Sequence, residues 1–309
     1  MRVLITGGTG RIGRALVRSL DTDGHESIVI SRRPEAGHGF PRAAKLVGWN
    51  TSPSGRRSWA DGVDAVVNLA GESIAGESLL AILFGRWTPK KKRRILGSRL
   101  DAGRGVVQAI EAATHRPAVL VQMSAVGFYG VEEPGAVDES APPGDDFLAR
   151  VCQQWEASTS AVDGLGVRRV VLRTASVLAP DSGVLPLMRL PFRLFVGGRL
   201  GNGRQPFPWV HIDDVIGVIR WAIDNPQAGG IFNLAAPDVL PNAEFAGLLG
   251  RVVRRPSWFP LPALVLRLMM GEKSTIVLQG QRPRPRRLEE LGYRFRFATA
   301  EAALGDLAG

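Results

Sequence analysis

The stretch Val3-Leu4-Ile5-Thr6-Gly7-Gly8-Thr9-Gly10-Arg11-Ile12-Gly13 decides the fold of this chain. It begins as a short apolar strand, and Ile12, Leu16 and Leu20 then recur at helical spacing. The spaced glycines permit a tight turn, close approach of the backbone to a phosphate, and close packing of helix on strand. The free N–H groups of the helix then face the turn, as in dinucleotide sites. We predict that this turn binds a dinucleotide through Gly7, Gly10, Arg11, Ile12 and Gly13.

A second strand, Ser27-Ile28-Val29-Ile30, ends in Ser31-Arg32-Arg33. An NAD site usually presents Asp or Glu at this point to the ribose 2′-hydroxyl. Guanidinium groups instead bind a 2′-phosphate through charge-assisted hydrogen bonds. The sequence therefore favours NADP(H) over NAD(H), with Ser31, Arg32 and Arg33 as contacts, although arginines that simply face the solvent would look the same.

Strands and helices alternate over the first half of the chain. Further strands are expected at 43–49, 64–69, 118–123 and 167–172, and helices at 89–114 and 146–162. This alternation predicts an α/β fold, a Rossmann-type doubly wound parallel sheet covered on both faces. Proline and glycine punctuate the sequence after residue 175.

The change in texture suggests two parts. We predict a Rossmann domain over residues 1–175 plus about 207–232, and a smaller, discontinuous substrate-side region over 176–206 and 233–309. Within the second part, the Gly-rich segment 197–205 is expected to form a substrate-side loop. Arg199 and Arg204 in that loop could bind an anionic group of a substrate, or could lie on a flexible surface loop.

The composition excludes several classes of protein. The chain has 309 residues, of which 45% are hydrophobic and 22% charged, and no apolar run is long enough to span a bilayer. It opens without a secretory signal pattern, so we expect a cytoplasmic protein without a membrane partner. One cysteine cannot form an internal disulfide, and four scattered histidines predict no metal site. An oligomer is compatible with the sequence.

The net charge of +10 arises from 39 basic residues, only five of them lysine. Such an excess can attract nucleotides, nucleic acid or acidic partners, but basic runs usually mark solvated surfaces. Two runs stand out, at 90–94 and 282–287. No recognised nucleic-acid fold accompanies them, so we do not expect a nucleic-acid partner.

Further motifs complete a resemblance to a known family. They are Asn68-Leu69-Ala70-Gly71, Ser124-Ala125-Val126-Gly127-Phe128-Tyr129-Gly130, Trp209-Val210-His211-Ile212-Asp213-Asp214 and Phe232-Asn233-Leu234-Ala235. With the glycine turn, they make the chain similar to an extended short-chain dehydrogenase/reductase, the class that contains nucleotide-sugar epimerases. It resembles more narrowly the atypical epimerase-family proteins, some of them described as cell-division-inhibitor-like. The segment 77–85 looks like an insertion relative to their pattern.

The resemblance implies that loops after the first, second, fourth and fifth strands hold the cofactor. It carries over Leu69, Ala70, Gly71, Ser124 and Ala125 as wall residues. It also places Arg99 beside the cofactor and Trp49 near the adenine, where an indole could stack on the base or pack in the core.

The usual acid-base pair of this superfamily is absent. The superfamily pairs a tyrosine with a lysine four residues later, but Tyr129 is followed at that distance by Glu133 and Tyr293 by Phe297. Candidate replacements are Tyr129, His211 and Asp145 or Asp146, although an aspartate here could instead cap a helix.

Three interpretations remain. The first is an atypical NADP(H)-dependent oxidoreductase or epimerase-like protein acting on an unidentified small molecule. The second is a non-catalytic NADP(H)-binding sensor or regulator. The third is a basic interaction module for nucleic acid or protein. Because fold does not dictate chemistry, the reaction in the first interpretation rests on the resemblance.

Overall fold

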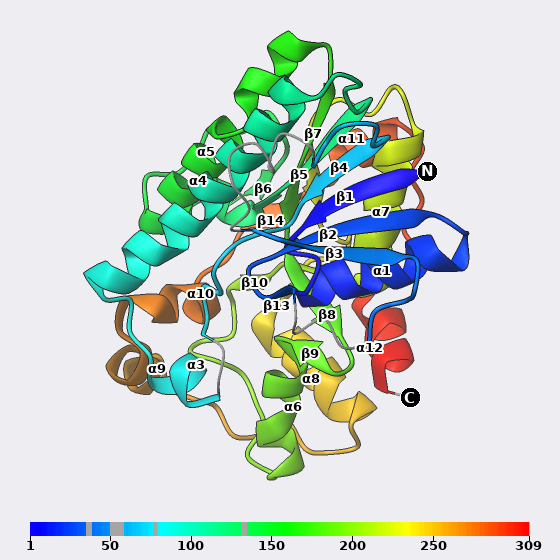
Figure 1. Cartoon of the computed structure of the whole chain (residues 1–309). Helices are drawn as coiled ribbons and strands as arrows, with labels where there is room; N and C mark the ends of the chain where they lie inside the picture. Colours follow the sequence, from blue (N-terminus) through cyan, green and yellow to red (C-terminus); the bar gives the residue numbers. More distant parts are fainter. Residues whose placement is uncertain (35–38, 50–58, 77–78, 131–134, 309) are drawn as a thin grey trace.

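The computed structural model is an α/β fold built on a seven-stranded parallel sheet (Figure 1). It describes residues 1–34, 39–49, 59–76, 79–130 and 135–308. In spatial order the strands are β12 (Gly230–Leu234), β7 (Arg168–Thr174), β5 (Val119–Ala125), β4 (Ala65–Asn68), β1 (Arg2–Thr6), β2 (Glu26–Ser31) and β3 (Ala44–Gly48). From β1 the chain continues to β2 and β3 on one side, and then returns to β4, β5, β7 and β12 on the other side. The direction of the crossover connections therefore reverses at β1. The predicted doubly wound parallel sheet is confirmed.

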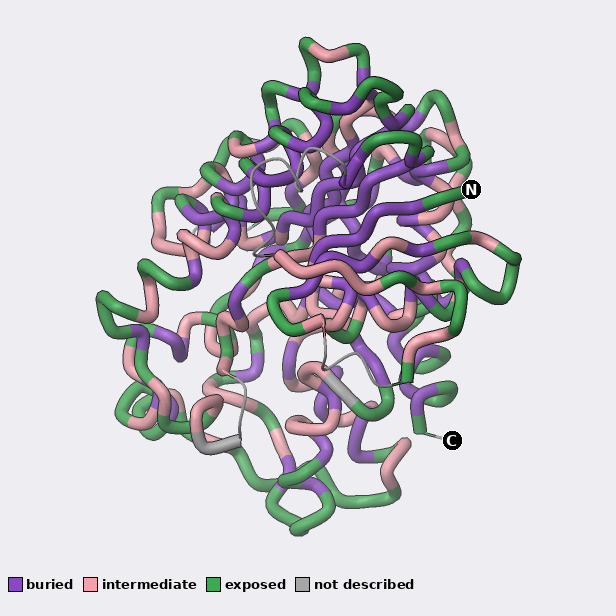
Figure 2. Tube along the Cα trace, in the orientation of Figure 1, coloured by how far each residue is buried: buried purple, intermediate pink, exposed green. Residues whose placement is uncertain are grey.

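Most residues of the strands are buried, purple in Figure 2, whereas the edge strand β3 is largely intermediate in burial. Successive side chains of a strand point to opposite faces. Val3 and Ile5 pack in one core with helices α1 (Arg11–Thr22) and α7 (Ile212–Asp224), while Leu4 packs in another core with α4 (Pro89–Ala112). The short apolar runs of the sequence are therefore central strands with helices on each side.

The long helix α4 begins at a proline and is capped by Thr88, whose hydroxyl accepts from the N–H of Lys91. It packs beside α5 (Phe147–Ala157), and both lie on the same side of the sheet in Figure 1. Asp146 caps α5 by accepting from the N–H of Ala149. The helix expected at 146–162 is thus shorter, and a 3₁₀ helix η3 (Ser160–Leu165) follows it.

A smaller group of elements lies below the sheet in Figure 1 and has its own apolar core, which includes Trp209, Phe245 and Leu304. Its helices are α3 (Leu79–Phe84), α6 (Leu185–Arg193), α8 (Asn242–Val252), α9 (Ala263–Met270), η4 (Gly271–Ser274), α10 (Thr275–Leu278) and α12 (Ala300–Ala308). Its strands are β8 (Ser176–Ala179), β9 (Ser182–Gly183), β10 (Pro206–Phe207), β11 (Trp209–His211) and β13 (Leu240–Pro241). Elsewhere, η2 (Val126–Tyr129) follows β5, and β6 (Ala136–Val137), β14 (Arg282–Pro283) and α11 (Arg286–Glu290) lie near β12.

A buried ion pair ties α5 to the sheet. Arg173 of β7 donates from Nε and Nη2 to the two carboxylate oxygens of Glu156, each at 3.0 Å. Ser124 donates to the same carboxylate at 2.7 Å. Arg173 also donates to the hydroxyl of Tyr129, which in turn donates to Asn233 Oδ1 at 2.6 Å. One network therefore joins β5, η2, α5, β7 and β12.

Replacing Glu156 with Gln tests the energetic weight of this network. The substitution keeps the size of the side chain but leaves the buried guanidinium of Arg173 without a counterion, which costs about 3–5 kcal/mol of unfolding free energy. The matched control is Asp163→Asn, because Asp163 pairs with Arg169 of the same strand but is more than half exposed. Its loss should cost at most about 1 kcal/mol. Urea unfolding at neutral pH measures both values, and equal losses would contradict the assignment.

Candidate functional site

Two cavities lie where the strands of the sheet end. The polar cavity, of about 660 Å³, is lined by the glycine turn after β1, the end of β2, the loop after β4 and one face of α4. The apolar cavity, of about 560 Å³, is lined by the end of β5, η2, α5 and segments from the smaller group of elements. Such crevices beyond the carboxyl ends of the strands are where doubly wound sheets bind their ligands.

The glycine turn brings the backbone close to the polar cavity. Gly7 has a φ of +69°, and a Cβ there would lie 2.8 Å from the backbone nitrogen of Ala70. Gly10 precedes α1, which has neither a side-chain cap nor an acidic residue in its first turn. Gly7 and Gly10 line the cavity. The free N–H groups and the positive end of the helix dipole are therefore available to an anion.

Gly13 and Arg11 have different positions from those predicted. A Cβ on Gly13 would lie 2.4 Å from the Cα of Gly8, so Gly13 serves the packing of α1 on the turn. Arg11 is exposed and lines neither cavity. Ile12, by contrast, lines the apolar cavity.

Basic side chains from two elements surround the polar cavity. Arg32, just after β2, lines it together with Lys90, Arg93 and Arg94 of α4. Arg94 is paired with Glu72 at 2.8 Å. Within the described ranges, Arg32, Lys90 and Arg93 have no ion-pair partner, so their charges are open to a ligand.

Not all of the contacts predicted at the end of β2 line the polar cavity. Ser31 is buried and lines the polar cavity, and its hydroxyl accepts from the N–H of Arg33 at 3.1 Å. Arg33 itself is exposed and lines neither cavity. Only the first of the two adjacent arginines therefore faces the cavity.

The remaining predicted contacts are divided between the two cavities. Trp49, Leu69, Ala70 and Gly71 line the polar cavity, whereas Arg99, Ser124 and Ala125 line the apolar one. The indole of Trp49 also contacts that of Trp59, with ring centroids 5.3 Å apart. The indole of Trp49 thus packs against the core and also faces the polar cavity, the two positions considered for it.

Arg99 lies at the boundary between the cavities. Its guanidinium donates to the carbonyls of Glu72 and Ile95 and stacks over the ring of Trp155 at 4.7 Å. It also lies against Gly71, where a Cβ would be 3.0 Å from Cζ. Burial lowers the pKa of Arg99 to about 10, which leaves the group charged at neutral pH.

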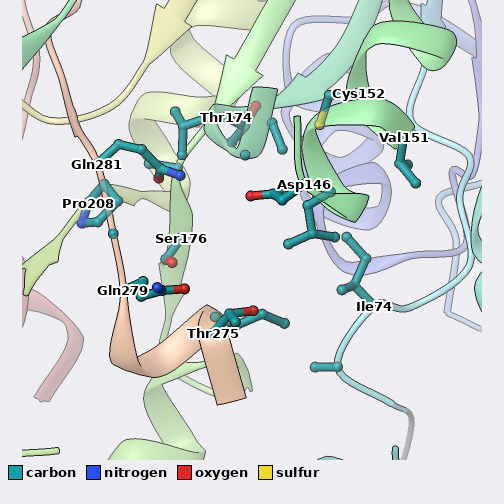
Figure 3. A pocket seen from close by; sticks show the side chains of 18 of the residues that line it. Ile74, Asp146, Val151, Cys152, Thr174, Ser176, Pro208, Thr275, Gln279 and Gln281 are labelled. Atoms are coloured by element: carbon teal, nitrogen blue, oxygen red, sulfur yellow. The ribbon is translucent and has the colours of Figure 1, made fainter. Parts of the chain in front are cut away.

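The face of α5 that lines the apolar cavity carries Leu148 and Cys152, four residues apart and therefore neighbours on the helix. Burial raises the pKa of the Cys152 thiol to about 12. Asp146, at the start of α5, points its carboxylate into the cavity (Figure 3). Among the described lining residues there is neither a tyrosine nor a lysine.

Tyr129 and His211, the two predicted catalytic residues, line neither cavity. The hydroxyl of Tyr129 is held between Arg173 and Asn233, and burial raises its pKa. His211 is 1% exposed, caps α7 through Nδ1, and stacks on Phe297. Each ring is thus held by hydrogen bonds and packing, and the catalytic roles of both residues stay predictions.

The two predicted substrate contacts are also outside the cavities. Arg199 and Arg204 are exposed, and only Gln205 at the end of their loop lines the apolar cavity. Neither arginine lines a cavity, and a contact of either with a substrate stays a prediction. The loop reaches the cavity through Gln205, whose amide nitrogen donates to the carbonyls of Leu200 and Val277.

Sequence reasoning missed two sets of residues. The first is the face of α4 that lines the polar cavity; its members follow helical spacing, a signal present in the sequence: Lys90, Arg93, Arg94, Gly97, Ser98 and Asp101. The second is the 272–281 segment, which lines the apolar cavity from far along the chain and has no local signature. In the ranges described, no three His, Cys, Asp or Glu residues gather as for a metal ion, and no helix has the length and apolarity to cross a membrane.

Known proteins resemble the chain over its full length. The NAD dependent epimerase/dehydratase family matches residues 3–235, and a domain of unknown function, DUF1731, matches residues 261–307. The chain is 40% identical to the chloroplastic SDR39U1 homolog of Arabidopsis thaliana, an epimerase family protein, covering 98% of this chain and 86% of that protein. It is 35% identical to the epimerase family protein YfhF of Bacillus subtilis, covering 99% and 98%.

Solved structures agree with this assignment. The human epimerase family protein SDR39U1, crystallised with NADPH, has a TM-score of 0.88 and 35% identity, with 100% of this chain and 99% of that one covered. A UDP-glucuronic acid 4-epimerase from Bacillus cereus, in complex with NAD, has a TM-score of 0.77 at 16% identity, with 100% and 98% covered, and shows the fold alone. The resemblance to extended short-chain dehydrogenases/reductases is confirmed, and the chain belongs to the NAD-dependent epimerase/dehydratase family.

Proposed function

We propose that this protein binds NADP(H) across both cavities and acts as an atypical NADP(H)-dependent oxidoreductase or epimerase-like protein on a small molecule. The observation that carries the proposal is the set of open cations, Arg32, Lys90 and Arg93, around a cavity that begins at a glycine turn. These groups suit a 2′-phosphate. The NADPH in the structure of human SDR39U1 supports the same choice of cofactor.

The lining residues form two groups, one for each half of the dinucleotide. In this proposal the turn at Gly7 and Gly10 faces the pyrophosphate, Trp49 stacks on the adenine, and Arg32 binds the 2′-phosphate. Ser31, Leu69, Ala70 and Gly71 complete this half, while Ile12, Arg99, Ser124 and Ala125 border the nicotinamide half. A bound nicotinamide would supply hydride exchange with a carbon of the substrate.

The absence of the usual acid-base pair supports a second candidate. The hydroxyl of Ser124 already donates to Glu156, and the Cys152 thiol stays protonated at neutral pH. Within the described lining, Asp146 is the carboxylate that points into the apolar cavity without a salt bridge. A sensor or regulator that binds NADP(H) without turnover would need no acid-base pair.

Arg32→Ala tests the cofactor assignment. The substitution should weaken NADPH binding about tenfold, which is about 1.4 kcal/mol, because one charge-assisted contact to the 2′-phosphate is lost. NADH binding should change little. Titration calorimetry with each dinucleotide measures the affinities at two salt concentrations.

The control is Arg33→Ala, which removes the same charge from the adjacent position that faces away from the cavity. It should leave the preference for NADPH over NADH unchanged. Equal effects of the two substitutions would sink the assignment of Arg32 and reduce the result to a change in net charge.

Trp49→Ala tests the adenine contact separately. Loss of stacking should weaken NADPH and NADH binding by the same factor, about 1 kcal/mol or roughly fivefold, because both carry the adenine. Trp49→Phe keeps an aromatic face and should recover most of the affinity. Calorimetry at a temperature where both variants are folded provides the measurement, and a loss confined to NADPH would rule out stacking.

A turnover assay separates the two candidate functions. The protein is incubated with NADPH and a panel of ketones and aldehydes, and with NADP⁺ and the matching alcohols, while the absorbance of reduced nicotinamide is followed. Turnover supports the oxidoreductase. Tight NADPH binding with no net oxidation or reduction of any member of the panel contradicts the oxidoreductase for these substrates, and it is the result expected of the sensor or regulator and of a redox-neutral epimerase.

A further inference from the structure

The apolar cavity holds few charges. Of its described lining residues, only Arg99, Asp146 and Glu272 are of the acidic or basic residue types Asp, Glu, Lys and Arg. Glu272 is paired with Lys92 at 2.7 Å. Arg99 lies at the boundary with the polar cavity, where its guanidinium is stacked on Trp155 and bonded to two carbonyls. Asp146 is therefore the one charge on this lining that points into the cavity without an ion-pair partner.

The geometry of Asp146 leaves one carboxylate oxygen open. Oδ1 accepts from the N–H of Ala149, as the cap of α5. Oδ2 has no hydrogen-bond partner in the part of the chain that the structure describes. Figure 3 shows the carboxylate pointing into the cavity, across from Thr174 and Gln281. The amide nitrogen of Gln281 is itself bonded to the carbonyl of Gly130.

The rest of the wall is largely apolar. It includes the rings of Trp87, Phe147 and Phe207 and the side chains of Leu148 and Ile276. A phosphate or carboxylate placed beside Asp146 would lose its hydration next to a like charge. Arg99, the cation of the described lining, is stacked on Trp155 at the boundary with the polar cavity. A hydroxyl on an apolar body would instead donate to Asp146 and bury its remaining surface.

We propose that the apolar cavity binds a largely apolar alcohol that carries neither phosphate nor carboxylate, with its hydroxyl donating to Asp146. This ligand class differs from the nucleoside-diphosphate sugars of the epimerases with the same fold. The proposal rests on the proposed function, since an alcohol is a group from which NADP⁺ accepts a hydride as the alcohol becomes a carbonyl. It replaces the anionic substrate group expected from Arg199 and Arg204.

Three naphthalene compounds test the proposal, because they share one apolar body and differ in one group: 2-naphthylmethanol, 2-naphthylmethylamine and 2-naphthoate. Each is titrated by calorimetry into the protein saturated with NADPH, and UDP-glucose is titrated in the same way. The alcohol should bind, the amine should bind at least as tightly, and the carboxylate should bind at least tenfold more weakly. UDP-glucose should not bind.

Asp146→Asn supplies the decisive variant. Asparagine is as good a helix cap as aspartate, so α5 should remain folded. Removal of the charge should reduce the difference between alcohol and carboxylate to less than threefold and weaken the amine at least fivefold. The matched control is Asp145→Asn, because Asp145 is exposed and does not line the cavity. It should leave all three affinities unchanged.

Several results would overturn the proposal. They are equal binding of alcohol and carboxylate by the unmodified protein, binding of UDP-glucose to the NADPH-saturated protein, failure of all three naphthalene compounds to bind, or an unchanged selectivity in Asp146→Asn. A failure of the proposed function is recognised separately, by a preceding titration in which NADPH does not bind. In that case the same naphthalene series on the free protein still decides the ligand class.

Discussion

The buried ion pair of Arg173 and Glu156 constrains the chemistry available at the whole site. Its carboxylate accepts the hydrogen bond of Ser124, and its guanidinium donates to Tyr129. Burial alone would lower the pKa of Arg173, but the hydrogen bonds and charge of Glu156 outweigh burial and raise it, so the guanidinium stays charged. Breaking the hydrogen bond between a hydroxyl and a buried ion pair costs free energy, so these two hydroxyls are not readily available for catalysis. The polar groups of a reaction must therefore come from side chains outside this network.

Several side chains of the two basic runs are also bound by ion pairs or hydrogen bonds. In the basic run on α4, Lys91 and Arg94 bind Glu72, and Lys92 binds Glu272. In the second run, Arg287 donates to the carbonyls of Ile231 and Gly229. Four basic side chains of the two runs are therefore bound within the molecule. Lys90 and Arg93 of α4, with Arg32 after β2, line the polar cavity without an ion-pair partner among the described residues.

Local patterns predicted the parts of the structure that depend on local interactions. The strands of the sheet, the glycine turn and the choice of Arg32 as a cavity residue all follow from residues close in sequence. His211 and Arg199 line neither cavity, because their positions depend on what packs against them, which a single sequence does not show. The 272–281 wall and the open oxygen of Asp146 depend on contacts between distant segments, and only the fold brings these together.

The apolar cavity is completed by the segment that matches a separate domain of unknown function. Lys273 in this segment is buried, and its ammonium donates to the carbonyls of Ala75, Ala81 and Ile82. A buried ammonium that loses its partners is strongly destabilising, so this contact holds the segment against the loop after β4. The cofactor half of the site is built by the sheet and α4 alone. Under the proposed function, changes in the C-terminal segment would alter substrate choice and leave the dinucleotide half as it is.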